Sequence, residues 1–186
     1  MLGKTGLWGL AVLVAAVVLG GCAAPSPSPS SRYYILSPLD AAKAEKPSSA
    51  AEKEISLGVG PVNIPPHLDR SQIVGHASPH KLNLAKLDQW AEPLKDNLTR
   101  VLAENLSLLM ASDKVETYPW RRSIDVDYQV VVDIIRFDAN RKRENVLIAR
   151  WKAFGNDGRK FLFSRRAQFI KKIPEGGFES VARTMS

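Results

Sequence analysis

The longest regular pattern in this chain is an alternation of apolar and polar residues between Ile124 and Asp138. Successive side chains of a strand point to opposite faces, so a period of two predicts a β-strand with one buried and one solvent-facing side. A strand of this length needs paired neighbours and a cover for its apolar side, which constrains the chain to a fold built on a sheet. The apolar face consists of Ile124, Val126, Tyr128, Val130, Val132 and Ile134, and the polar face of Asp125, Asp127, Gln129 and Asp133.

Two further strands follow this segment. The sequence ANRKREN (139–145) predicts a turn, and in Val146–Phe154 apolar residues again recur at every second position. The sequence GNDG (155–158) is typical of a tight turn, and Lys160–Ile170 form the next predicted strand. Three consecutive strands joined by short turns predict an antiparallel meander sheet.

A helical period is present between Glu92 and Ala111. Its apolar residues recur at steps of three and four, which predicts an amphipathic helix with Pro93 in the first turn. We expect this main helix to cover the sheet, which makes the fold class α+β. A groove for a partner helix is the alternative use of the stripe. The stripe consists of Trp90, Leu94, Leu98, Val101, Leu102, Asn105 and Leu109.

The segments before this helix contain shorter strand signals. Arg32–Leu39 and Ile55–Pro66 are strand candidates, and two prolines end the second one. Residues 71–87 predict a hairpin that turns near Pro79. Between the first two strands, Asp40–Glu54 is rich in Ala, Lys, Glu and Ser and predicts a loop.

The N-terminus has the pattern of an export signal. Leu7–Leu19 is an uninterrupted apolar run of 13 residues. As a helix it is about 20 Å long, too short for a hydrocarbon core of about 30 Å and typical of a signal peptide. The next residues include the only cysteine, and Leu19-Gly20-Gly21-Cys22 resembles the lipobox of bacterial lipoproteins. In those proteins the thiol receives a diacylglycerol and the chain is cleaved before the cysteine. An ordinary signal peptide with a chance cysteine is the alternative.

This resemblance divides the chain into three parts. Residues 1–21 are the expected signal peptide, 22–31 the lipidated Cys22 with its Pro/Ser tether, and 32–186 a periplasmic domain. The covalent lipid on Cys22 is the only group we expect the chain to carry, and we expect no cofactor. Two alanines follow the cysteine where many lipoproteins retained in the inner membrane have Asp, so the expected location is the outer membrane, facing the periplasm.

The formal net charge of +7 suggests an anionic partner. Because the chain is exported, we expect no nucleic acid but anionic lipid headgroups or an acidic protein surface. A solvated basic surface is the alternative. Strand counting places the turn after the long strand and the end of the last strand at the same edge. The candidate basic patch there consists of Arg141, Lys142, Arg143, Lys171 and Lys172.

No arrangement of residues predicts catalysis. His76 and His80 are four residues apart, but Pro79 argues against a helix that turns both toward one metal ion. Gly58-x-Gly60 lacks the third glycine of a phosphate-binding loop, and no G-x-S-x-G motif is present. We therefore expect no catalytic residues, no metal site and no enzyme activity.

Several segments together resemble the ABC-type transport auxiliary lipoproteins, the PqiC/YmbA-like group associated with MCE-type lipid transport systems. The resemblance implies a non-catalytic component that docks or supports an MCE-domain protein, with inner-membrane transporter components as further partners. A homo-oligomer is compatible with this role, and a structural or assembly lipoprotein of another envelope complex is the alternative. Besides the lipobox, the matching segments are YYIL (33–36), VGPVNIPPHLDRSQIV (59–74), LDQWAEPLKDNLTRVLAENL (87–106), YPW (118–120) and DYQVVVDI (127–134).

The resemblance also points to a loop and to the C-terminus. In the loop, internal scaffolding is the alternative to partner contact. Members of the family usually have a second helix, which GGFESVARTMS (176–186) only begins, so we expect this helix to be truncated. The candidate partner-binding residues in the loop are Pro65, Pro66, Leu68, Asp69 and Arg70.

The lipid anchor generates the first prediction. Because stable anchoring depends on the acyl chains attached at Cys22, Cys22→Ser is expected to release the protein from the membrane or to mislocalise it. Fractionation of cells that produce the wild-type and variant chains measures this. Stable membrane retention of the variant would contradict the anchor.

Overall fold

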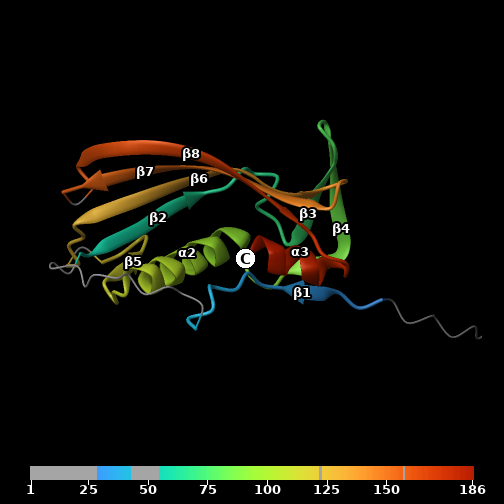
Figure 1. The fold of residues 1–186 in the computed structure, drawn as a ribbon, viewed down its shortest axis with the longest axis horizontal. Helices are drawn as coiled ribbons and strands as arrows, with labels where there is room; N and C mark the ends of the chain where they lie inside the picture. Colours follow the sequence, from blue (N-terminus) through green and yellow to red (C-terminus); the bar gives the residue numbers. More distant parts are fainter. Residues whose placement is uncertain (1–28, 43–54, 122, 157) are drawn as a thin grey trace, which may run out of the picture. The chain divides into compact units, whose positions relative to one another are not determined.

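The computed structural model describes residues 29–42, 55–121, 123–156 and 158–186. The predicted signal peptide, Cys22 and most of the tether lie outside the described residues, as does most of the predicted loop Asp40–Glu54. Residues 31–186 form one unit, in which the described strands make a single mixed sheet with two helices on one face (Figure 1).

The sheet is built around β6 (Tyr128–Asn140), which has paired neighbours on both edges. β7 (Glu144–Gly155) lies antiparallel along one edge, and β8 (Lys160–Lys172) lies antiparallel beyond β7. Two parallel strands share the other edge. β2 (Leu57–Asn63) pairs with the first half of β6, and β3 (Gln72–Ser78) pairs with its last two residues.

Three more strands extend the sheet from β2 and β3. β5 (Val115–Thr117) pairs in parallel with β2, β4 (Lys81–Trp90) pairs antiparallel with β3, and β1 (Arg32–Tyr34) pairs in parallel with β4. Four of these seven pairings are parallel, so the predicted antiparallel meander is not confirmed: the sheet is mixed. The physical reason is that β2 and β3 both reach β6 running in its direction.

The helices confirm the α+β class. α2 (Leu94–Met110) agrees with the predicted helix 92–111, although Pro93 is the N-cap residue and not part of the first turn. Its buried leucines and Val101 belong to the main core, which they form with the apolar face of β6, and the predicted core residue Trp90 is 6% exposed. A second helix, α3 (Phe178–Met185), lies on the same face of the sheet (Figure 1).

Eight residues are too few for a stable isolated helix, so α3 depends on tertiary contacts. Ala182 is 5% exposed, and Phe178, Val181 and Met185 pack against the main core. The side-chain amide of Asn145 on β7 also donates a 2.8 Å hydrogen bond to the carbonyl of Val181. The helix that residues 176–186 are expected to begin is thus present over Phe178–Met185.

Strand β2 is buried from Leu57 to Gly60, as expected for a parallel strand that is covered on both faces. Val59 packs with Ala103 of α2 on one face. On the other face a Cβ at Gly58 would lie 2.6 Å from Cη2 of Trp120, so the indole ring fits only against glycine.

The first strand is joined to β4 by a buried carboxylate. Asp88 is 4% exposed. It accepts hydrogen bonds from Arg32 Nε at 2.7 Å and Nη2 at 2.9 Å, and from the Tyr34 hydroxyl at 2.9 Å. These hydrogen bonds raise the pKa of Arg32, and burial together with the Asp88 contact raises the pKa of Tyr34. Arg32 therefore stays charged and Tyr34 stays protonated at neutral pH.

Two asparagines of α2 hold the segment that follows β1. Asn97 is 1% exposed, and its Oδ1 accepts the backbone N–H of Leu36 at 2.7 Å while its Nδ2 donates to the Leu36 carbonyl at 3.4 Å. Two turns further along α2, Asn105 Oδ1 accepts the N–H of Leu39 at 2.7 Å, in a more exposed position. Leu36 is thereby held in the core.

Removal of the Asn97 side chain is expected to destabilise the domain. Asn97→Ala leaves the buried N–H and C=O of Leu36 without partners, which costs about 2–4 kcal/mol of unfolding free energy. Asn105→Ala is the matched control and is expected to cost less than about 1 kcal/mol, because water reaches the Leu39 N–H. Urea denaturation of both variants measures the difference, and equal losses would contradict the assignment.

Candidate functional site

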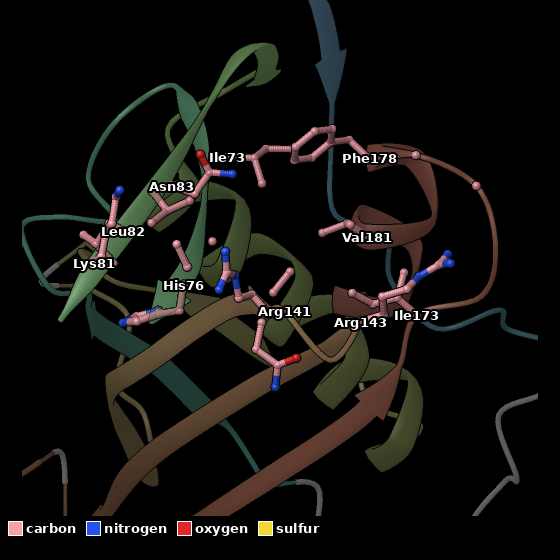
Figure 2. Close-up of a pocket in the computed structure, with 17 residues that line it drawn as sticks. Ile73, His76, Lys81, Leu82, Asn83, Arg141, Arg143, Ile173, Phe178 and Val181 are labelled. Carbon is pink, nitrogen blue, oxygen red and sulfur yellow. The ribbon is translucent and has the colours of Figure 1, made fainter. Parts of the chain in front are cut away.

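A pocket of about 580 Å³ lies between the β3–β4 hairpin, the β6–β7 turn and the start of α3 (Figure 2). Its apolar walls come from segments far apart in the sequence. Ile73 of β3 and Phe178 of α3 point toward one another across it, and Val181 points into it from the same helix (Figure 2). The pocket therefore has an apolar interior.

The rim of this pocket is cationic. Lys81 from the hairpin and Arg141 and Arg143 from the β6–β7 turn line it, and none of its 17 lining residues is Asp or Glu. Neither Lys81 nor Arg141 forms an ion pair within the described part of the chain. The positive charge at the rim is therefore available to an anion.

Local hydrogen bonds fix the turn that carries the two arginines. Asn140 Oδ1 accepts the backbone N–H groups of Lys142 at 2.8 Å and Glu144 at 3.1 Å, which closes the turn. The carbonyl of Arg143 accepts the N–H of Ile173 at 2.8 Å, so the chain after β8 lies against the turn. The guanidinium of Arg143 donates to the carbonyl of Pro174 at 3.0 Å, which holds the loop before α3.

A buried ion cluster supports the pocket wall formed by His76. Asp138 is fully buried, and Arg136 donates to both of its carboxylate oxygens at 2.8 Å. Nδ1 of His76 lies 2.9 Å from Oδ2 of the same carboxylate. The hydrogen bonds to Asp138 raise the pKa of Arg136. The cluster thus joins β3 to β6 where their backbones share only two residue pairs.

The structure brings the two parts of the predicted basic patch together, but it separates their side chains. Only Arg141 and Arg143 line the pocket, while Lys142 is exposed and does not. Lys171 lines a second cavity, and Lys172 lines neither. A binding role for these five residues stays a prediction.

The second cavity, of about 520 Å³, lies between α2, α3 and strands β6–β8. Leu109, Phe137, Phe169 and Met185 give it apolar walls. Asn145 also lines it, and its buried Oδ1 has no hydrogen-bond partner among the described residues. Lys171 is the one charged side chain among the residues that line this cavity.

The predicted partner-binding loop connects β2 and β3. Leu68 is 2% exposed and belongs to the main core, so its side chain is not available to a partner, and the prediction is corrected at this position. Pro65 is half-buried, whereas Pro66, Asp69 and Arg70 are exposed. A partner contact by these exposed residues stays a prediction.

Sequence reasoning missed Lys81 and the apolar walls of the pocket. Lys81 follows the turn of a hairpin, and Phe178 begins a helix, so no local signal relates them to Arg141. Within residues 29–42, 55–121, 123–156 and 158–186, no three His, Cys, Asp or Glu side chains form a group that could hold a metal ion. In the same residues, no helix has the length and apolar character needed to cross a membrane.

Two solved structures have the same fold. One is a crystal structure of an uncharacterized protein, 19% identical, with a TM-score of 0.68 over 84% of this chain and 90% of that chain. The other is protein XCC0632 from Xanthomonas campestris, assigned to DUF330, 15% identical, with a TM-score of 0.69 over 83% of this chain and 86% of that chain. A comparison with curated proteins finds no match. The domain is thus an α+β domain of the class these two structures represent.

The family model of the ABC-type transport auxiliary lipoprotein component matches residues 34–186. The chain belongs to this family, and the resemblance inferred from the sequence is confirmed. The family match agrees with an association of the chain with ABC-type transport and with the cell envelope.

The buried cluster generates a prediction about the stability of the domain. Asp138→Asn leaves the guanidinium of Arg136 without its buried counter-charge and is expected to cost about 2–4 kcal/mol of unfolding free energy. Asp133→Asn is the matched control on the same strand. The Asp133 side chain is 30% exposed and its pKa is lowered by hydrogen bonds from Asn63 and Lys152. We expect this control to cost less than about 1 kcal/mol in urea denaturation. A larger loss for Asp133→Asn would contradict the prediction.

Proposed function

We propose that this protein is an outer-membrane-anchored accessory lipoprotein of an MCE-type intermembrane phospholipid transport system. In this role it is non-catalytic, and it docks or supports the MCE-domain protein, while inner-membrane transporter components supply the energy. Membership of the transport auxiliary lipoprotein family supports the general role. The lipobox-like sequence at Cys22 and the alanines that follow it support the outer-membrane anchor.

The observation that carries the docking role is the exposed edge strand β8. Every residue of β8 except the half-buried Ala167 is exposed. Its free edge has no strand partner in the described part of the chain. Soluble proteins usually protect such an edge, because exposed apolar edge strands pair readily with other chains. The large apolar side chains, 40–57% exposed, are Phe161, Leu162, Phe163, Phe169 and Ile170.

Protein docking explains an apolar edge of this kind better than solvent exposure does. Apolar and aromatic side chains supply most of the binding energy in the centre of protein interfaces. Arg165 and Arg166 interrupt the apolar residues in the middle of β8 and add polar specificity. We propose that β8 contacts the MCE-domain protein.

Co-purification tests this function. The full-length lipoprotein, tagged at its C-terminus and extracted from membranes, is expected to retain an MCE-domain protein that mass spectrometry identifies. The double variant Phe163→Glu/Ile170→Glu is expected to lower this recovery by about tenfold, because it places a charge in each of the two apolar groups of β8. Tyr33→Glu, at a 65% exposed aromatic residue of β1, is the control and is expected to leave recovery unchanged.

Two outcomes would overturn the proposal. Recovery of a different envelope complex without any MCE-domain protein would assign the chain to the alternative role in assembly. Equal losses with the β8 and β1 variants would remove β8 as the docking strand. Both variants are expected to fold, because the substituted side chains are exposed. Circular dichroism checks this and so excludes unfolding as the cause of a loss.

A further inference from the structure

We propose that the pocket beside α3 binds the headgroup of a single anionic phospholipid, with the phosphate at Arg141 and the start of one acyl chain against Ile73 and Phe178. The choice of a phospholipid rests on the proposed function. The chemistry of the ligand, an anionic head on an apolar body, follows from the pocket itself.

The charge of the pocket selects an anion. Arg141 and Lys81 lie on its rim without an ion-pair partner in the described residues. None of the lining residues is acidic. Asp138 is buried against Arg136, and Glu179 is paired with Arg183 at 2.9 Å. Glu144 and Glu175 flank lining residues but do not themselves line the pocket. An arginine guanidinium binds phosphate through two parallel hydrogen bonds, which makes Arg141 the natural contact.

The apolar walls select an amphiphile over a free anion. The volume of about 580 Å³ lies within the range of roughly 300–1,000 Å³ that is typical of small-molecule sites. Leu82 of β4 lines the pocket and is 38% exposed, and Leu84, two residues further along β4 and outside the pocket, is 40% exposed and continues the apolar surface. A headgroup in the pocket therefore leaves an acyl chain in contact with apolar side chains both inside and outside it.

Arg143 has a different role from Arg141. Its guanidinium donates to the carbonyl of Pro174, and its own carbonyl accepts the N–H of Ile173. Both bonds hold the loop that leads to α3 and frames the pocket. Arg143 is therefore a positioning residue, and Arg141 is the contact whose substitution should affect binding alone.

The same turn supplies a matched control. Lys142 is exposed and lies next to Arg141, but its side chain does not line the pocket. Arg141→Ala and Lys142→Ala each remove one positive charge from the same turn. A site-specific contact distinguishes the two variants, and a general attraction between a basic surface and an anionic membrane does not.

The experiment labels the full-length lipoprotein in detergent micelles with a photoreactive phosphatidylglycerol and maps the modified peptides by mass spectrometry. We expect labels on residues 73–84 and 173–181. Arg141→Ala is expected to lower this labelling about tenfold, because a charge-assisted contact is lost. Lys142→Ala is expected to stay within about twofold of wild type. A photoreactive phosphatidylcholine and competition with glycerol 3-phosphate complete the comparison.

Each contrary result overturns the inference. Equal labelling by the zwitterionic probe would show that the pocket does not select an anionic headgroup. Equal losses of labelling in Arg141→Ala and Lys142→Ala would show that general surface charge, and not a specific contact, attracts the probe. Full competition by glycerol 3-phosphate would make the site a phosphate site. Labels confined to the second cavity, around Leu109 and Met185, would move the ligand there. If the wild-type protein is not labelled but still co-purifies with the MCE-domain protein, the pocket alone is refuted. If it is labelled but no MCE-domain protein co-purifies, only the proposed function is refuted.

Discussion

The whole fold depends on the way in which one edge of β6 is divided between two parallel strands. β2 occupies the first half of this edge and β3 the last two residues, so the chain between them leaves the sheet and returns to the same strand. That excursion buries Leu68 in the core. Because the backbone pairing of β3 with β6 is so short, the contact between Asp138 of β6 and His76 of β3 completes the joint, and Arg136 on β6 neutralises the buried Asp138. The hairpin wall of the pocket is held through this joint.

Periodicity predicted those parts of the fold that depend on local sequence. The steps of three and four residues gave α2 within two residues of its ends. The alternation of apolar residues gave β7 and β6, although β6 begins at Tyr128 and not at Ile124, and the turn sequence GNDG gave the position of β8. The alternation fails at a register shift between Ile134 and Arg136, after which Phe137 joins the core face. The parallel pairing of β2 and of β3 with β6 could not be predicted, because it joins segments that are distant along the chain and has no local sequence signal.

The candidate site shows the same division. Strand counting brought the β6–β7 turn next to the end of β8, since an antiparallel pair fixes which residues are opposite. It did not show which way the side chains point. In the structure, Lys171 lines the second cavity and not the pocket. The proposed pocket and the proposed docking strand also use different residues: none of the residues that line the pocket belongs to β8. The two proposed sites therefore do not compete for residues.

The contact between Arg32 and Asp88 has a mechanical consequence. Arg32 is the first residue of the first strand, and β1 lies parallel to β4 at the edge of the sheet. Tension that enters the domain at Ser31 along the strand axis loads the backbone bonds of β1 and the two guanidinium bonds together, in shear. Bonds that must break together resist force better than bonds that open one after another. The domain is thus built to bear strain at its first strand.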